Sequence, residues 1–231
     1  MIDFKILLKD LYYFGPTQKY INRRWKDPTK VIIDRSVVKY IVTPEGLIFP
    51  VSDAGILHQV IWEYRFDDLK PDDVVLDLGA NIGAFSLRAA QKCKHVYAVE
   101  PLYTDELKEN IARNNLQDKI SVIPYGIGYG EKIPIKYLDR VKEIQTYPLS
   151  EILKITGPIS FMKCDIEGAE WTIQPEDIAG IPRMEFEVHE GCDSCMPEKP
   201  ELLEYIRKNW RTETNKKILW YPGCYIHAYP V

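Results

Sequence analysis

The chain has 231 residues, 28% of them charged and 45% hydrophobic, with a formal net charge of −4. That length suits one α/β domain with a proper core, and the acidic balance excludes a global field that attracts nucleic acid. No apolar run approaches the ~20 residues that span a bilayer, and Asp3 and Lys5 interrupt the short apolar start, unlike a signal peptide. We therefore expect a cytoplasmic protein without membrane contact.

The first part of the chain predicts an N-terminal extension. Residues 1–30 mix aromatic and basic side chains, and they fit either an edge segment packed on the domain or a lid over a site. Two β-branched or apolar runs flank Pro44-Glu45-Gly46, which predicts a hairpin. We expect residues 1–52 to form this extension and residues 53–231 to form the main domain.

A strand, a glycine-spaced turn and a helix follow one another after residue 73. Val74 to Leu76 predicts a buried parallel strand that ends at Asp77, and residues 84–90 predict a helix. In α/β folds such a unit forms a ligand crevice at the carboxyl end of the strand. Gly79 and Gly83 allow the backbone to turn sharply and to approach a ligand closely.

The residues of this turn indicate which kind of ligand it binds. A dinucleotide fingerprint needs another glycine where Ala80 and Asn81 stand, and Asp77 would repel a pyrophosphate. An acid at this place suits an ammonium group instead. The next strand, residues 95–99, is followed by Glu100, and an acid there typically accepts from ribose hydroxyls. Ammonium and ribose without phosphate describe S-adenosylmethionine better than NAD.

The rest of the chain alternates helices and strands up to residue 189 and closes with a hairpin. This alternation predicts an α/β fold with a mostly parallel sheet, to which the hairpin adds one antiparallel strand. The expected helices are 54–64, 104–115, one from about Leu149, and 200–210; the expected strands are 120–123, 159–164 and 183–189, with a short extra strand and loop at 132–142 and the hairpin at 218–221 and 225–229 around Pro222-Gly223.

Three blocks of sequence resemble a known family. They are Asp77 to Gly83, Val99-Glu100-Pro101, and Lys163 to Glu170, which reads K-C-D-I-E-G-A-E. Together they resemble the signature blocks of the FkbM-like S-adenosylmethionine-dependent methyltransferases, over residues 58–190. Most class I methyltransferases share the first block, whereas D-I-E-G-A-E makes the match specific. The resemblance implies a Rossmann-like class I methyltransferase fold, with a seven-stranded sheet in the strand order of that class.

The cofactor site follows from the turn and from the resemblance together. Asp77 should lie near the amino-acid end of S-adenosylmethionine, and Glu100 should accept from both ribose hydroxyls. The resemblance places adenine after the third strand, where Tyr125 either packs on the purine or belongs to the core. The expected cofactor-binding residues are Asp77, Gly79, Ala80, Asn81, Gly83, Glu100, Pro101, Tyr125 and Asp165.

Acidic and imidazole side chains gather at the expected ends of the fourth and fifth strands. Period-two alternation puts Lys163 and Asp165 on one face, and Glu187 and His189 on one face of the next strand. A structural ion pair is the favoured interpretation of Lys163 with Glu187. We expect Asp165, Glu167 and His189 to be catalytic, although a structural role for His189 is equally open. His189 ranks first as base, because an unperturbed pKa of about 6.5 suits neutral-pH proton transfer. Magnesium is less favoured, since the ligand set of catechol-type O-methyltransferases is not visible, and no metal ligand is assigned.

Five cysteines, an odd number, do not fit a complete disulfide framework. Cys93 and Cys164 fall in expected elements and should be reduced core residues. The other three belong to a separate pattern, His189-x-x-Cys192-x-x-Cys195 with Cys224-x-x-His227 far downstream. This spacing resembles a structural zinc site, while a Cys192–Cys195 disulfide or free thiols are the alternatives.

The function expected from the resemblance is S-adenosylmethionine-dependent O-methylation of a small-molecule or sugar-like hydroxyl. Methylation of RNA or protein is the second possibility. The acidic balance weighs against RNA, and the N-P-P-Y-type motif of amino-methylating nucleic-acid enzymes is absent from the sequence. A third possibility is a module that binds the cofactor without catalysis. Acids and His189 at the strand tips favour an enzyme over that module.

Overall fold

The computed structural model describes residues 40–53, 56–57, 60, 64–137, 140–189, 198–216 and 223–231. The chain divides into two compact units, residues 1–64 and 65–231. The expected boundary, after residue 52, lies upstream of this division. The aromatic segment 1–30 and most of the helix expected at 54–64 fall outside the described residues.

A small hairpin is the main feature of the first unit. Strands β1 (Tyr40–Val42) and β2 (Ile48–Pro50) pair antiparallel, and the 3-10 turn η1 (Val51–Asp53) follows. Gly46 adopts a φ of 87° in the connecting turn, a backbone conformation that glycine takes without steric cost. The hairpin expected around Pro44-Glu45-Gly46 is therefore present.

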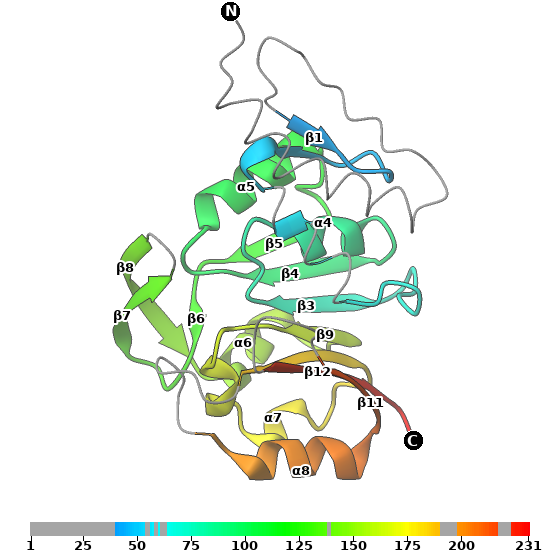
Figure 1. The fold of residues 1–231 in the computed structure, drawn as a ribbon, viewed down its shortest axis with the longest axis vertical. Helices are drawn as coiled ribbons and strands as arrows, with labels where there is room; N and C mark the ends of the chain where they lie inside the picture. The colour runs from blue at the N-terminus through cyan, green and yellow to red at the C-terminus, as the bar shows by residue number, and fades with distance from the viewer. Residues whose placement is uncertain are drawn as a thin grey trace, which may run out of the picture. The chain divides into compact units, whose positions relative to one another are not determined.

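The second unit is built on a seven-stranded sheet in the order β11-β12-β10-β9-β3-β4-β5 (Figure 1). The neighbours from β10 to β5 all run parallel, whereas β12 runs antiparallel to both β10 and β11. This confirms the expected mostly parallel sheet with an antiparallel C-terminal strand. The strands are β3 (Val74–Leu78), β4 (His95–Val99), β5 (Ile120–Ile123), β9 (Phe161–Cys164), β10 (Met184–His189), β11 (Arg211–Lys216) and β12 (Gly223–Tyr229).

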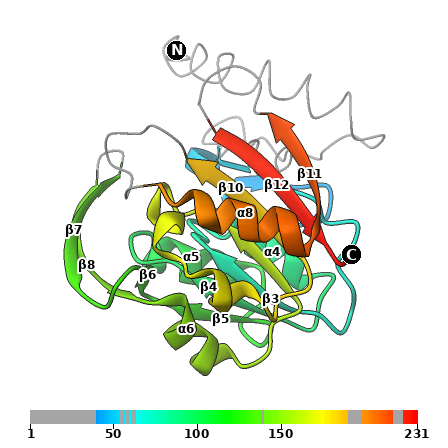
Figure 2. The same ribbon diagram turned by 90° about the horizontal axis from the view of Figure 1, so that it is seen from below.

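Helices and a smaller sheet surround these strands. The helix α8 covers the part of the sheet formed by β10 and β12 (Figure 2). The region expected to hold one extra strand forms two, β7 and β8, which pair antiparallel. The helical elements are α4 (Ala84–Ala90), α5 (Thr104–Arg113), α6 (Leu149–Thr156), η2 (Ala169–Thr172), α7 (Pro175–Ile178) and α8 (Pro200–Asn209). The small sheet, in the order β6-β8-β7, contains β6 (Gly126–Ile127), β7 (Lys132–Tyr137) and β8 (Arg140–Tyr147).

Alternation along the central strands separates an apolar face from a partly charged one. Leu76, Met162 and Phe186 are fully buried and join the core that includes side chains of α6, α7 and α8. The residues that alternate with these along each strand point to the opposite face of the sheet, toward α4. There Phe161 stacks on Phe85 of α4, with ring centroids 6.2 Å apart. Charged residues of β3, β9 and β10 share this face, which brings them together at the strand ends.

The closing hairpin differs from the sequence expectation. Its first strand is β11, residues 211–216, whereas the apolar run 218–221 lies outside the described residues. β11 is an edge strand with one neighbour, and residues 211–214 are exposed or half-buried. An edge strand needs no apolar run, so the hydrophobic pattern did not reveal it.

Two further expectations concern cysteine and the bilayer. Cys93 and Cys164 are buried free thiols, as expected. Burial raises the pKa of Cys93 to about 11 and that of Cys164 well above its ordinary value. No helix among the described residues is long and apolar enough to cross a bilayer.

Candidate functional site

The turn after β3 lies directly against the chain that follows β9. Gly79 has a φ of 76°, and a Cβ built on it would lie 1.8 Å from the carbonyl oxygen of Asp165. The N–H groups of Gly79 and Ala80 both donate to the carbonyl of Val99, at 3.0 and 3.1 Å. Asn81 is also left-handed, with a φ of 50°. The turn therefore joins the carboxyl ends of β3, β4 and β9, and Gly79 is needed for that backbone contact.

Asp77 lies inside β3 and is fully buried, rather than at the end of a shorter strand. Its Oδ2 accepts a 2.5 Å hydrogen bond from the Ser86 hydroxyl of α4, and its Oδ1 lies 3.2 Å from Nζ of Lys163. The carboxylate thus already holds an ammonium of the protein, and its expected place near the amino-acid end of the donor stays a prediction. Asp77 acts on the turn through Lys163, which donates to the carbonyl of Gly79 at 2.8 Å.

The buried ammonium of Lys163 connects the two halves of the site. It lies 3.6 Å from Asp165 Oδ2 as well as beside Asp77. Burial opposes its charge, but the two carboxylates outweigh burial and raise its pKa. The expected partner was Glu187, yet the register places Lys163 opposite Glu185, and the ammonium turns toward β3. The cause is the sheet order, which puts β9 between β3 and β10.

Glu100, directly after β4, is a buried carboxylate held by backbone. Its Oε2 accepts from the N–H of Asn81 at 2.7 Å, and its Oε1 accepts from Leu102 and Tyr103 at 2.6 and 2.9 Å. Burial raises its pKa despite these bonds. A carboxylate offers about four acceptor positions, so about one is left for a ligand in this conformation. One ribose hydroxyl therefore fits, and a second requires the exchange of a backbone bond.

Pro101 and Tyr125 lie beside the ends of β4 and β5. Pro101 Cγ is 3.8 Å from a Cβ built on Gly126, so the two segments touch. The half-buried ring of Tyr125 packs edge-on against Tyr147, with centroids 4.8 Å apart. That packing is compatible with both interpretations of Tyr125, and its contact with a purine stays a prediction.

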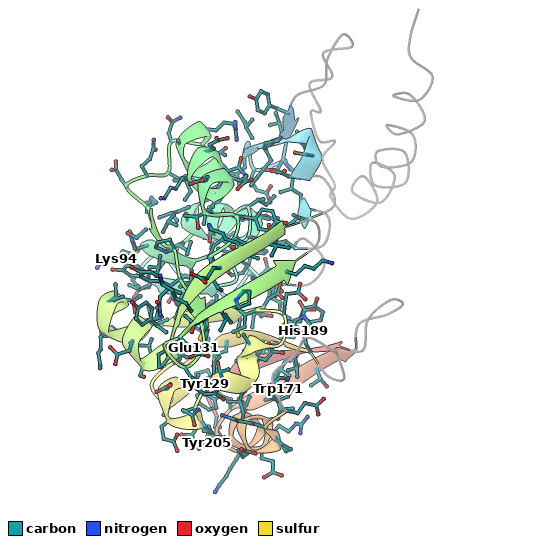
Figure 3. The ribbon with its side chains drawn as sticks, turned by 90° about the vertical axis from the view of Figure 1, so that its left-hand side faces the viewer. Lys94, Tyr129, Glu131, Trp171, His189 and Tyr205 are labelled. Atoms are coloured by element: carbon teal, nitrogen blue, oxygen red, sulfur yellow. The ribbon has the colours of Figure 1, made fainter. Side chains whose placement is uncertain are left out.

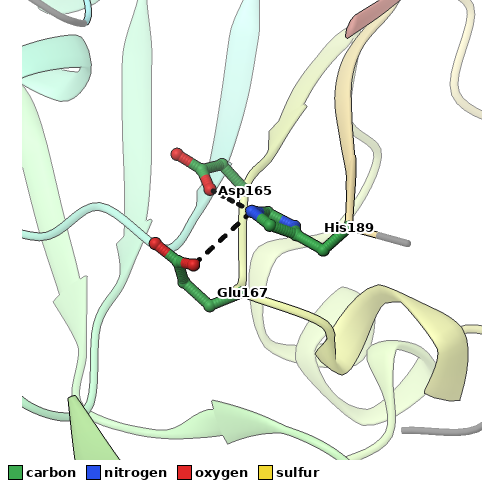
Figure 4. Close-up of side chains that lie close together, drawn as sticks. All are labelled: Asp165, Glu167 and His189. Atoms are coloured by element: carbon green, nitrogen blue, oxygen red, sulfur yellow. Dashed lines mark ion pairs between the residues drawn. The ribbon is translucent and has the colours of Figure 1, made fainter. Parts of the chain in front are cut away.

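The ends of β9 and β10 bring Asp165, Glu167 and His189 together (Figure 4). Nε2 of His189 lies 3.9 Å from Asp165 Oδ1 and 3.5 Å from Glu167 Oε2. Glu187 Oε1 is 3.7 Å from the same nitrogen. Glu167 has a φ of 53°, a conformation uncommon outside glycine and typical of functional turns. The sequence predicted these three residues as one group, and the structure places them within contact of one another.

The surroundings of His189 affect its ability to act as a base. Burial opposes the positive charge, but the hydrogen bond to Glu170 and the charges of Glu170, Glu187 and Asp165 outweigh burial. The pKa of His189 is thereby raised to about 9. At neutral pH a raised pKa favours the protonated imidazole, which accepts no proton, so Asp165 and Glu167 become the better candidates for the base. The sequence argument used the unperturbed pKa because it did not place Glu170 against the imidazole.

Glu170 contacts His189 directly but was not assigned to the site from the sequence. It is fully buried and accepts from the N–H of Gly168 at 2.8 Å and of His189 at 2.7 Å. Its Oε1 also lies 3.1 Å from His189 Nδ1, which fixes the ring. Trp171, next in the chain, donates from Nε1 to the His189 carbonyl at 2.8 Å, and both residues are labelled in Figure 3. The available signal was its place as the last letter of D-I-E-G-A-E.

The two histidines of the expected zinc pattern lie too far apart to bind one ion. His227 pairs in register with Glu185 and contacts its carboxylate, four residues along β10 from His189. At 3.3 Å per residue this separation is about 13 Å, too far for two ligands of one ion. Cys192 and Cys195 lie outside the described residues, as does the side chain of Cys224.

Comparison with known proteins gives the family. The model of the methyltransferase FkbM domain matches residues 77–209, more than half of the chain. The 23S rRNA (uracil(1939)-C(5))-methyltransferase RlmD of Aliivibrio salmonicida is 30% identical over 113 residues, 47% of this chain and 24% of that protein. The uncharacterized RNA methyltransferase YljE of Lactococcus lactis is 35% identical over 77 residues, 32% of this chain and 16% of that protein. The chain thus spans a quarter or less of the length of these curated relatives.

Solved structures show the fold. A proposed rRNA methylase from Clostridium thermocellum superposes with a TM-score of 0.50 at 13% identity, covering 71% of this chain and 89% of that one. A chain of a fibrillarin/Nop5p complex gives 0.50 at 14% identity, covering 84% and 98%. The sheet order, the turn after β3 and the match over residues 77–209 agree with one another, and the chain belongs to the FkbM methyltransferase domain family.

Proposed function

We propose that this protein is an S-adenosylmethionine-dependent methyltransferase that acts on a hydroxyl of a small neutral molecule, with sugar-like hydroxyls as first candidates. One observation carries the proposal: the turn next to Glu100 and the cluster of Asp165, Glu167 and His189 lie at the same sheet edge, where Gly79 contacts the Asp165 backbone. Family membership supports the donor, and the acids support a hydroxyl acceptor.

The turn and Glu100 fit the donor. Glu100 keeps about one acceptor position for a ribose hydroxyl, and its three backbone bonds hold it in place. The donor, when bound, supplies a methyl group already activated as a sulfonium. Lys163 holds the carbonyls of Leu78 and Gly79 at 3.3 and 2.8 Å, which keeps the turn in one conformation. The protein's main contribution is to position donor and acceptor.

The proton of the acceptor hydroxyl needs a base. Asp165 and Glu167 are the candidates, because they are partly exposed, whereas Glu170 is fully buried and engaged with His189. Either carboxylate takes the hydroxyl proton as the new carbon–oxygen bond forms and the methyl–sulfur bond breaks. His189 acts as a fixed positive neighbour of these carboxylates. Asp165→Asn should lower turnover by about 10²-fold while leaving donor binding nearly unchanged.

RNA is the second candidate acceptor, because two named relatives are RNA methyltransferases. Nucleic acid presents a phosphate for every nucleotide, and recognition depends on Lys and Arg contacts. Around His189 the structure instead gathers Asp165, Glu167, Glu170 and Glu187. That local charge disfavours phosphate and favours a neutral acceptor.

A labelled-methyl screen separates the candidates. Purified protein is incubated with isotope-labelled S-adenosylmethionine and, separately, with small-molecule extract, glycans and total RNA. We expect label in a small-molecule or glycan fraction, and none from the Asp165→Asn variant above background. Label confined to ribonuclease-sensitive material would replace the small-molecule acceptor by RNA.

A further inference from the structure

The group at the ends of β9 and β10 has a second possible occupant besides an acceptor hydroxyl. We propose that Asp165, Glu167 and His189 form a binding site for one divalent metal ion, with Nε2 of the imidazole and one oxygen from each carboxylate as ligands. This proposal does not depend on which molecule accepts the methyl group. Imidazole is a common ligand of first-row divalent ions and carboxylate oxygens suit Mn²⁺, so Mn²⁺ is a suitable probe of this ligand set.

The distances from Nε2 of His189 to the two carboxylates fit one ion. One ligand atom from each residue can be chosen so that all three lie within 4.8 Å of one another. The Nε2 distances, 3.9 Å to Asp165 and 3.5 Å to Glu167, exceed an ordinary N–H···O hydrogen bond. At metal–ligand distances of about 2.1 Å, ligand atoms stand about 3.0 Å apart at right angles and about 4.2 Å apart when opposite. Both measured distances fall inside that interval.

His189 supplies the independent observation that points to a ligand. Its side chain is 4% exposed, and its ring makes one described hydrogen bond, from Nδ1 to Glu170. Nε2 faces the carboxylates of Asp165 and Glu167 (Figure 4) and lies 3.7 Å from that of Glu187, and none of these distances is that of an ordinary hydrogen bond. A metal-ligating histidine typically donates its other ring N–H to a carboxylate, which orients the ring. Glu170 occupies that position, so it is the positioning residue of the site.

The negative charge around His189 also favours a bound cation. Asp165, Glu167, Glu170 and Glu187 surround the imidazole of His189, and Glu170 and Glu187 are nearly or fully buried. Grouped carboxylates in a poorly solvated place need positive charge to offset their repulsion. One dication replaces the proton on Nε2, which leaves to solvent, and adds a net positive charge to the group.

A metal ion at this site would change which group takes the proton of the acceptor hydroxyl. This consequence rests on the proposed function. A bound divalent ion lowers the pKa of a hydroxyl that coordinates it. The hydroxyl proton can then pass to solvent, and Asp165 and Glu167 serve as ligands. Their partial exposure, 23% and 46%, leaves room for such a hydroxyl or water.

The test is a Mn²⁺ titration of the whole, chelator-treated chain, with free Mn²⁺ followed by electron paramagnetic resonance. We expect one ion per chain. Asp165→Asn and Glu167→Gln should each weaken binding by about 100-fold or more, and Glu170→Gln by about 10- to 100-fold. Glu201→Gln is the matched control, an exposed acid in the first turn of α8, and should bind as the wild type does.

Glu167→Gln keeps the test decisive even if a buried variant fails to fold, because this side chain is nearly half exposed. The proposal is wrong if the wild type takes up no Mn²⁺, or if Glu167→Gln and Asp165→Asn bind it unchanged. Calorimetry with S-adenosylmethionine is run on the same samples. Donor binding without Mn²⁺ uptake would contradict the metal site and leave the proposed function standing. Mn²⁺ uptake without donor binding would contradict the proposed function and leave the metal site standing.

Discussion

Glu100 is the single side chain on which donor binding should depend most. Replacement by Ala removes the acceptor for a ribose hydroxyl, and a hydrogen bond to a charged group is worth about 1.5–3 kcal/mol. We expect Glu100→Ala to weaken S-adenosylmethionine binding by roughly 10- to 100-fold, measured by calorimetry. Glu109→Ala, an exposed acid on α5, serves as the control. Equal affinity for wild type and Glu100→Ala would show that Glu100 does not touch the donor.

The pairing of Glu170 with His189 should be visible in the pH dependence of stability. A histidine with a raised folded pKa contributes stability that is complete below its ordinary value of 6.5 and is lost as pH rises through about 9. In chelator-treated protein, the free energy of unfolding should therefore fall by up to about 3 kcal/mol across this window.

Urea unfolding at several pH values measures this loss, with Glu170→Gln as the comparison. The variant removes the strongest source of the raised pKa of His189 and should show a flatter curve between pH 6.5 and 9. Parallel curves for the two proteins would mean that Glu170 does not stabilise the charged imidazole.

At the scale of elements, the contact between the turn after β3 and the chain after β9 holds the two parts of the site together. A Cβ on residue 79 would lie 1.8 Å from a backbone oxygen, and the φ of 76° is also unfavourable for alanine. We expect Gly79→Ala to lower the free energy of unfolding by about 3 kcal/mol or more. Gly180→Ala, where the new Cβ meets nothing within 4 Å, should change it by about 0.5 kcal/mol or less. Similar losses in both variants would contradict this account of Gly79.

Element positions were largely predictable from local sequence. Strands 95–99 and 120–123 and the helix at 84–90 match, because continuous apolar runs and a glycine turn define them. The edge strand β11 was missed because its polar sequence has no pattern to detect. The site was predictable as a set of residues, since motif and strand ends identify Asp165, Glu167 and His189. The raised pKa of His189 was not predictable, because it depends on how Glu170 and Glu187 pack around the imidazole.

At the scale of the whole molecule, the sheet order explains why the site lies where it does. β3 and β9 are neighbours at the centre, with β4 on one side and β10 on the other. The residues proposed to bind the donor therefore follow β3 and β4, and the cluster of Asp165, Glu167 and His189 lies at the ends of β9 and β10. This division predicts that variants after β3 and β4 affect donor binding, whereas variants at the ends of β9 and β10 affect turnover.

The most direct test of the central claim is the rate of labelled methyl transfer to the active fraction as a function of S-adenosylmethionine concentration. The account predicts that Glu100→Ala raises KM for the donor with kcat largely retained. It predicts that Asp165→Asn lowers kcat by about 10²-fold with KM little changed. Full turnover by Asp165→Asn at saturating donor would contradict the assignment of the acceptor site to the ends of β9 and β10.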